Sequence, residues 1–166
     1  MKFLGILVPP VRIRDDIRLP ANEYVIKLRG SEVARAEVLP RFMMALNTGG
    51  VVAEIDGMES IDPSFGMPAK WIADTQRENA QFNGYTVVDN ANVVVTHLTE
   101  IVKDNLADLL TRSELDKLLD ELRGTHGKLI DELVPDKISK PILQKVLQNL
   151  LRERVSIRDL PGILEA

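Results

Sequence analysis

Alternating apolar and polar positions near the start of the chain are typical of β-structure. Residues 4–14 form an extended segment in two pieces, because Pro9 and Pro10 cannot donate hydrogen bonds to a β-ladder. Residues 11–14 then alternate apolar with basic side chains. This pattern predicts an edge strand.

A second alternating segment predicts a β-hairpin. Residues 23–29 place three apolar side chains on one face, those of Tyr24, Ile26 and Leu28. The Gly-Ser pair at 30–31 is a suitable two-residue turn into residues 32–38, which would complete the hairpin.

Three further β-rich runs follow in the middle of the chain, at residues 51–55, 69–72 and 85–88. Each is predicted to be a strand. The apolar run at 41–46 is bounded by a proline and a turn signal, but it is too short for its periodicity to separate a strand from a helix.

Two helices are predicted around the last of these strands. The residues from Thr75 to Glu78 match a capping box, and Gly84 is suited to the end of the short helix that would follow. Asp89 and Asn90 are cap residues for apolar positions at helical spacing up to Leu110, which predicts the longest helix of the chain.

The remainder of the chain has helical spacing. A capping box at 111–114 opens a helix that should stop before Gly124, and shorter helices are predicted at 128–134 and 141–151. Strands therefore precede helices along the chain, which favours an α+β fold over an alternating α/β fold.

Composition and charge mainly exclude classes of function. The 166 residues carry a formal net charge of −4, the wrong sign for a general binder of nucleic-acid phosphates. The absence of Cys excludes thiol nucleophiles and thiolate metal sites, and it fits a reducing compartment. The apolar run at 3–11 is too short to span a bilayer, and no cleavage site follows it, so we expect neither a membrane span nor a signal peptide.

Few residues could carry chemistry. His97 and His126 lack the spacing of metal ligands, so no metal site is expected, and His97 is interpreted as a helix-face residue that contacts the strand layer. No phosphate-binding or dinucleotide-binding glycine motif occurs, so no cofactor is expected. One enzymatic alternative stays open, a small hydrolase that uses Asp62 and His97 as an acid/base pair.

The stretch from 62 to 71, Asp-Pro-Ser-Phe-Gly-Met-Pro-Ala-Lys-Trp, combines turn residues with large apolar side chains. Trp71, the only tryptophan, begins a predicted strand and is expected to anchor the loop in a core. For Phe65, the residues alone support two interpretations equally. It either caps the protein's own core or belongs to a surface that recognises a partner.

Seven motifs occur in a fixed order over nearly the whole chain: VRIRD at 11–15, DPSFG at 62–66, AKWI at 69–72, GYTVVD at 84–89, THL at 96–98, LVP at 133–135 and SIRDL at 156–160. Together they resemble the cytosolic region of the large export-gate membrane proteins of type III secretion systems. The first motif, together with the strand that begins at Glu23, is more similar to the flagellar branch of this family.

The resemblance implies a division into three subdomains. Residues 1–40 and 90–110 would form a split first subdomain, 41–89 an inserted small α/β subdomain similar to an RNA-recognition fold, and 111–166 a truncated helical subdomain. Members of the family also have an N-terminal membrane region and a further subdomain after the helical one, so the chain resembles a fragment. Their Ile-Arg-Asp-Leu motif usually continues as a helix, whereas Pro161-Gly162 here predicts a helix that begins at Pro161.

For function, the resemblance implies a non-enzymatic part of a flagellar protein export gate at the cytoplasmic face of the bacterial inner membrane. In the full-length protein it would form a ring of nine copies. Its partners would be flagellar export chaperones with their substrates and other export-apparatus proteins, without nucleic acid and without a membrane span in this fragment. A purely structural ring spacer is the remaining alternative.

The resemblance also implies a binding site. Family members bind chaperone–substrate complexes in an apolar dimple, whose residues by motif match are Asp62, Phe65, Val88 and Thr96. We expect these residues to lie close together if residues 84–92 are one strand-to-helix connection.

Overall fold

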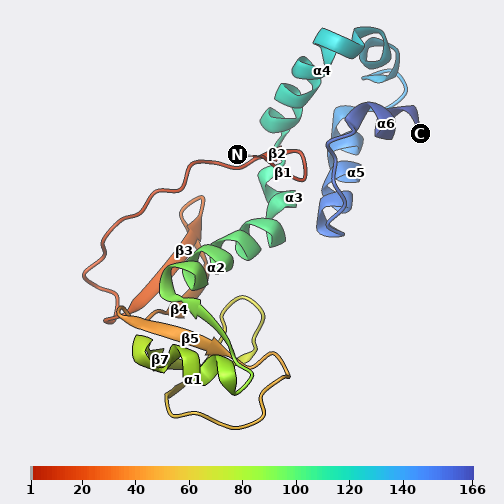
Figure 1. The fold of residues 1–166 in the computed structure, drawn as a ribbon. Coiled ribbons are helices and arrows are strands. Elements are labelled where there is room, and N and C mark those ends of the chain that lie inside the picture. Colours follow the sequence, from red (N-terminus) through yellow and green to blue (C-terminus); the bar gives the residue numbers. More distant parts are fainter. Residues whose placement is uncertain (1) are drawn as a thin grey trace. The chain divides into compact units, whose positions relative to one another are not determined.

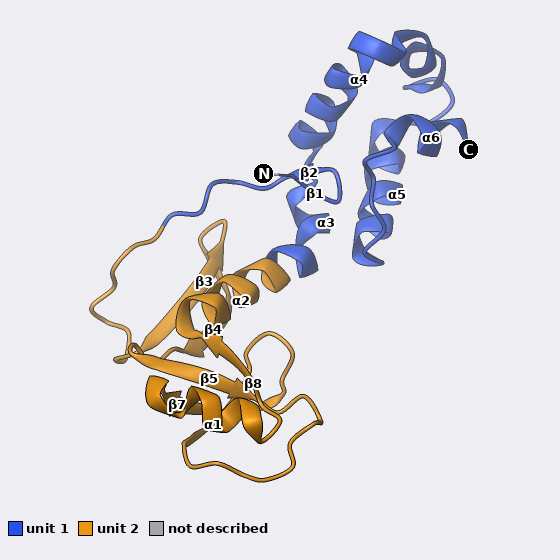
Figure 2. Ribbon diagram, viewed as in Figure 1, with its two compact units in different colours: residues 1–12, 102–166 blue, residues 13–101 orange. Residues whose placement is uncertain are grey.

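The computed structural model describes residues 2–166, which form two compact units (Figures 1 and 2). One unit consists of residues 13–101 and contains most of the strands. The other consists of residues 1–12 with 102–166 and is mostly helical. The predicted α+β class is therefore confirmed, and the three-subdomain division stays a prediction.

In the first of these units, strands β3 (Glu23–Leu28) and β4 (Ser31–Glu37) form the predicted antiparallel hairpin. The two turn residues are Arg29 at φ 52° and Gly30 at φ 80°, one residue earlier than the predicted pair Gly30-Ser31, because Ser31 already belongs to β4. Two-residue hairpin turns need positive φ because their twist then matches that of the flanking strands. The alternation at 23–29 was thus sufficient to locate this element.

A four-stranded antiparallel sheet forms the centre of the same unit. Its strands are β5 (Phe42–Leu46), β6 (Met58–Ile61), β7 (Pro68–Ala73) and β8 (Thr86–Asp89), in the order β6-β7-β5-β8. Strands β7 and β8 confirm the predictions at 69–72 and 85–88. The ambiguous run at 41–46 is the central strand β5, where Met44 and Ala45 are both fully buried. A strand covered on both faces shows no apolar–polar alternation.

The strand predicted at 51–55 is wrong, because this segment belongs to a loop. The amide of Val52 donates to the carbonyl of Asn83 at 3.0 Å, and Lys70 Nζ donates to the carbonyl of Ile55 at 2.9 Å. These backbone groups therefore bond to a loop residue and a side chain rather than to a neighbouring strand. The edge of the sheet is formed instead by β6, which sequence analysis did not predict.

Each face of the sheet buries its own apolar cluster. One cluster contains Met44, Ala69, Trp71 and Val93, and the other contains Ala45, Ile55, Ile72, Ala80 and Tyr85. Helix α1 (Arg77–Phe82) contributes Ala80, whereas helix α2 (Asn90–Asp104) contributes Val93, so the two helices cover opposite faces. Trp71 is 3% exposed, which confirms its role as a core anchor.

The likeness of this sheet to an RNA-recognition fold is not confirmed. A β-α-β-β-α-β arrangement has a helix after its first strand. Along this chain the residues between β5 and β6 form a loop, and α1 follows β7 and precedes β8.

The two predicted caps in this unit have different outcomes. Asp89 caps α2 as predicted, since its Oδ1 accepts from the amide of Asn92 at 2.8 Å. The capping box at 75–78 is wrong, because a 3₁₀ turn (Asp74–Gln76) precedes α1 and neither helix start has a side-chain cap. Gly84 ends α1 as predicted, with φ 91°, and a Cβ there would collide with the backbone of Gly50.

The helical unit is built from α3 (Leu106–Leu109), α4 (Arg112–Leu133), α5 (Lys140–Arg152) and α6 (Leu160–Glu165). Between residues 102 and 166, the fully buried side chains are mostly leucines at the predicted spacing: Leu106, Leu110, Leu115, Leu119, Ile130, Leu143, Leu147 and Leu151. The cap predicted at Thr111 is confirmed, because its side chain accepts from the amide of Glu114 at 3.2 Å.

Two predicted helix boundaries need correction. The long helix expected to reach Leu110 ends at Asp104, and Asn105 separates it from α3. The predicted division of residues 112–134 into two helices is confirmed, because a non-helical backbone at His126 (φ −130°, ψ 40°) breaks α4 close to the predicted stop before Gly124. Helix α6 begins at Leu160, one residue before the predicted Pro161.

Of the extended segment predicted at 4–14, only Ile6–Leu7 forms a strand, and the edge strand expected at 11–14 is wrong. Strands β1 (Lys2–Phe3) and β2 (Ile6–Leu7) form a minimal hairpin, and residues 8–16 contain no regular element. Pro9 and Pro10 interrupt the extended segment, because neither can donate a hydrogen bond to a neighbouring strand. Among residues 2–166, no helix is long and apolar enough to cross a bilayer.

Candidate partner-binding site

Residues 62–67 form a tight turn that joins β6 to β7. The amide of Asp62 donates to the carbonyl of Met67 at 2.8 Å, and the amide of Gly66 donates to the carbonyl of Asp62 at 2.9 Å. In addition, Asp62 Oδ2 accepts from the amide of Phe65 at 2.8 Å. Asp bonds readily to the backbone a few residues ahead, and Gly66 supplies the positive φ of 72° that the turn needs.

This turn has a buried polar base and an exposed apolar tip. Asp62 is 5% exposed, whereas Phe65 is 61% exposed. The hydroxyl oxygen of Ser64 is buried and has no hydrogen-bond partner within the described part of the chain. The turn therefore presents an aromatic ring to solvent from a backbone that a buried carboxylate holds in place.

His97, on α2, forms a hydrogen bond with Tyr24 on β3. Tyr24 Oη lies 2.7 Å from His97 Nδ1, and the ring centroids are 5.6 Å apart in an edge-to-face arrangement. His97 is 4% exposed, so its ring is enclosed between the helix and the hairpin. The prediction that His97 contacts the strand layer is thus confirmed.

The carboxylate of Asp62 acts electrostatically on both members of this pair. Burial, and then the negative charge of Asp62, raise the pKa of the Tyr24 phenol to about 12. Burial lowers the pKa of His97, and the charge of Asp62 opposes this shift. Tyr24 consequently keeps its proton and can donate it to Nδ1 of a neutral imidazole.

Asp62 and His97 do not form the acid/base pair that the hydrolase alternative requires. Within the described part of the chain, the carboxylate bonds to the amide of Phe65 and the imidazole bonds to Tyr24. No hydrogen bond joins Asp62 to His97 among these residues. The geometry gives no support to acid/base chemistry at this position.

Thr96 and Val88, the other two predicted site residues, lie in different surroundings. Thr96 is exposed on α2, directly before His97. Val88 is half-buried in β8, where it packs against the cluster that contains Trp71. Because β8 and β6 are opposite edges of the sheet, three strand spacings, roughly 14 Å, separate them.

Helix α2 connects the strand that contains Val88 to the region around Thr96 and His97. It begins directly after β8, packs Val93 against Met44 and Trp71 in the middle of the sheet, and then brings His97 within reach of the Asp62 charge. The structure therefore joins Asp62 and Phe65 in one turn and places Thr96 on the helix that approaches it. Val88 lies on the edge strand opposite β6, and its place in the site stays a prediction.

Sequence reasoning did not assign a site role to Tyr24. The only signal was its position on the apolar face of the hairpin, as the one residue of that face with a polar atom. A half-buried tyrosine hydroxyl needs a hydrogen-bond partner, and that partner comes from a residue 73 positions later.

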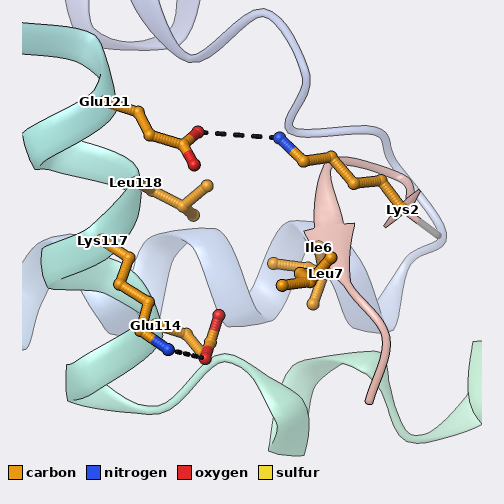
Figure 3. Close-up of a pocket in the computed structure, with 7 residues that line it drawn as sticks. All are labelled: Lys2, Ile6, Leu7, Glu114, Lys117, Leu118 and Glu121. Atoms are coloured by element: carbon orange, nitrogen blue, oxygen red, sulfur yellow. Dashed lines mark hydrogen bonds and ion pairs between the residues drawn. The ribbon is translucent and has the colours of Figure 1, made fainter. Parts of the chain in front are cut away.

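The helical unit contains a separate shallow groove between β2 and α4 (Figure 3). An ion pair between Lys2 Nζ and Glu121 Oε2 at 3.6 Å lies across it, and Lys117 Nζ pairs with Glu114 Oε1 at 3.2 Å along α4. Exposed ion pairs of this kind contribute little to stability. None of the predicted site residues lines this groove.

The surroundings of His97 predict that folding stability decreases as the pH falls below about 6.5. Because the pKa of His97 is lowered in the folded state, the unfolded chain takes up this proton first, and protonation then favours unfolding. Tyr24 bonds to the His97 ring, and the charge of Asp62 acts on it. Urea denaturation at about pH 7.5 and 5.5, followed by Trp71 fluorescence, measures the effect.

His97→Asn is the matched control for this pH dependence, because it keeps an acceptor near the position of Nδ1 but does not titrate. The variant should lose less stability than the parent protein between the two pH values. The other histidine, His126, is present in both proteins, so it does not contribute to the difference between their pH dependences. An identical pH dependence in the two proteins would contradict the assignment to His97.

The model of the FHIPEP family matches residues 1–166. A flagellar biosynthesis protein FlhA from Caulobacter vibrioides is 51% identical over 161 residues, which cover 97% of this chain and 23% of the relative. The FlhA of Bacillus subtilis is 44% identical over 162 residues, which cover 98% of this chain and 24% of the relative. The chain thus spans about a quarter of the length of these relatives.

Solved structures share the fold at lower sequence identity. The Chlamydia pneumoniae CdsV and CdsO protein complex contains a chain with a TM-score of 0.81 and 20% identity, covering 97% of this chain and 50% of the other. The C-terminal domain of InvA has a TM-score of 0.70 and 23% identity, covering 97% and 49%. Nonameric EPEC SctV-C has a TM-score of 0.68 and 21% identity, covering 97% and 48%.

Proposed function

The chain belongs to the FHIPEP family, and from this premise we propose that it is a docking module for chaperone–substrate complexes in a flagellar type III export gate. Phe65 is the apolar anchor of the docking site, Thr96 lies at its polar rim, and Asp62, which is buried, holds the backbone of the turn that carries Phe65. The mechanism is non-covalent binding, without a catalytic step.

The observation that carries this proposal is the exposure of Phe65 on a rigid turn. A phenylalanine that is 61% exposed loses favourable burial energy unless a partner covers it. Because the backbone of the turn is closed by three hydrogen bonds, little conformational freedom remains to be lost on binding. Aromatic side chains held in this way are typical centres of protein interfaces.

Thr96 and Val88 contribute in different ways. Thr96 is exposed on α2 and carries a hydroxyl that can bond to a partner at the rim. Val88 belongs to the opposite edge strand and packs with the Trp71 cluster. In our proposal Val88 therefore supports the apolar floor under α2 and does not contact the partner's anchor group.

The location and assembly of the whole protein are part of the same proposal. We place this segment at the cytoplasmic face of the bacterial inner membrane, in a ring of nine copies that also contacts other export-apparatus proteins. Nonameric SctV-C and one chain of the CdsV–CdsO complex share this fold; the first is a nonamer, and the second is a complex of two proteins. They support the proposal by likeness of fold.

The proposal predicts saturable binding when residues 1–166 are titrated with flagellar chaperones that carry their export substrates. Isothermal titration calorimetry should give a 1:1 complex with a Kd in the micromolar range or below, because one exposed aromatic anchor on a rigid turn is a typical centre for a binding site. The same titration with chaperones of unrelated cargo is the control. Absence of binding at high micromolar concentration would favour a structural ring spacer instead.

A further inference from the structure

Strand β6 leaves one edge of the four-stranded sheet without a partner. It is the terminal strand and pairs only with β7. The amide of Asp62, directly after β6, donates to the carbonyl of Met67 at 2.8 Å in the register of that pairing. Hydrogen-bonded and non-hydrogen-bonded pairs alternate along an antiparallel ladder. Counting back from Asp62, the backbone groups of Glu59 and Ile61 therefore point away from β7, out of the sheet.

The β6 edge lacks the features that usually protect a free edge from pairing. Proteins protect edges with charged side chains, prolines or β-bulges. The β3–β4 hairpin has such features, because its register shifts once and β4 carries three charged side chains. Strand β6 pairs in a continuous register, contains no proline and has Glu59 as its single charged residue. Its apolar residues Met58 and Ile61 are 47% and 67% exposed.

The surroundings of this edge are acidic. Glu54, Asp56 and Glu59 are all exposed. Lys70 Nζ lies 3.9 Å from Glu54 Oε2, and among residues 2–166 no ion pair joins a cation to Asp56 or Glu59. Opposite charges on directly facing strand residues stabilise a pairing. The edge is therefore suited to a strand that alternates apolar and basic residues.

Residues 11–14 of the same chain have this alternation, as Val-Arg-Ile-Arg. Figure 1 shows them within a long stretch that has no helix or strand. All four side chains are exposed, with Val11 at 59% and Ile13 at 93%. Within the described part of the chain, no hydrogen bond pairs their backbone with another segment. This segment thus has the pattern of an edge strand but no sheet to join.

We propose that residues 11–14 of one copy add to the β6 edge of a second copy as an antiparallel fifth strand. The register that places Arg12 opposite Glu59 satisfies both backbone and side chains. Glu59, whose backbone points outward, then exchanges two hydrogen bonds with Arg12, and the two charges face each other. The same register places Ile13 opposite Met58, so that two exposed apolar side chains cover each other.

This pairing joins two different surfaces, so each copy can donate to one neighbour and accept from another. Contacts of this head-to-tail kind close into rings when the rotation between copies allows it. The inference rests on the proposed assembly of copies and supplies a contact for it. It does not depend on chaperone docking.

Disulfide trapping between two single-cysteine variants tests the pairing, because the chain has no cysteine of its own. Ile13→Cys and Met58→Cys are mixed at high protein concentration and oxidised with glutathione disulfide. In the proposed register these residues form a non-hydrogen-bonded pair with Cα atoms roughly 4.5 Å apart, which a disulfide can bridge. We expect a covalent heterodimer on non-reducing gels, with its mass confirmed by mass spectrometry.

Val52→Cys replaces Met58→Cys in the matched control. Val52 is 81% exposed but lies in the loop before β6, so it reacts with Ile13→Cys only by random collision. The Ile13–Met58 mixture should give roughly tenfold more heterodimer than this control, because pairing raises the effective concentration of the two thiols. Arg12→Glu in the donor should reduce this excess, and Glu59→Arg in the acceptor should then restore it.

Three results would overturn the inference. The first is an equal heterodimer yield for Met58→Cys and Val52→Cys. The second is a disulfide that forms only within one chain, in the double variant Ile13→Cys/Met58→Cys. The third is the absence of any heterodimer, which would leave the β6 edge to a strand of a different protein. None of these results bears on chaperone binding, which the calorimetric titration measures separately.

Discussion

Phe65→Ala is expected to weaken binding of loaded flagellar chaperones about 30-fold, which corresponds to about 2 kcal/mol, the loss typical of an interface hot spot. The ring is 61% exposed in the free protein, so its removal leaves no cavity in the core. The hydrogen bond from residue 65 to Asp62 is made by the backbone amide and is retained in the variant. The urea midpoint of the free protein should therefore change little.

Phe82→Ala is the matched control for this experiment. Phe82 is also an exposed phenylalanine, at 87%, but it lies on α1, which covers the face of the sheet opposite to α2. Its removal should leave the affinity unchanged. If Phe65→Ala lowers the stability as much as it lowers the affinity, Phe65 belongs to the protein's own core and the docking proposal loses its anchor.

Trp71→Ala is expected to lower the free energy of unfolding by about 3–5 kcal/mol, as for other large aromatic side chains truncated in a core. Trp71 is 3% exposed and lies in the cluster that joins β5 and β7 to α2 through Val93. A typical domain has only about 5–15 kcal/mol of stability in total. Residues 13–101 should therefore be marginally folded in this variant.

Urea denaturation followed by far-UV circular dichroism measures this loss, because the variant has no tryptophan fluorescence. Trp71→Phe is the control, since it retains an aromatic ring in the same cavity and should cost clearly less. The Ala variant should also bind loaded chaperones poorly, because α2 and the turn both depend on this cluster. A loss of stability below about 1 kcal/mol would contradict a central packing role for Trp71.

Local chemistry explains where prediction from sequence succeeded. The hairpin at 23–37 shows alternation and a Gly-containing turn, and the caps at Asp89 and Thr111 are side-chain bonds to amides three residues ahead. The turn at 62–67 has the same character, since Asp62 and Gly66 determine it within six residues. Each of these features depends on neighbours in the sequence.

Competition between local and distant partners explains where prediction failed. The apolar run at 41–46 has no alternation, because β5 is covered on both faces by elements that follow it in the chain. Residues 51–55 have the composition of a strand, but the edge position beside β7 is taken by β6. Thr75 has the pattern of a cap, yet α1 begins two residues later, after a 3₁₀ turn.

The turn from Asp62 to Met67, with an aromatic residue at its tip, was thus determined by the sequence itself, because every bond that closes it spans only a few residues. Whether Phe65 faced solvent or the core could only be decided by the tertiary structure, since that depends on how segments distant in the sequence pack around the turn. The hydrogen bond between Tyr24 on β3 and His97 on α2 is an example of such packing, because the two residues are 73 positions apart. No local sequence pattern predicts this contact. It forms only because α2 packs against the hairpin that contains β3.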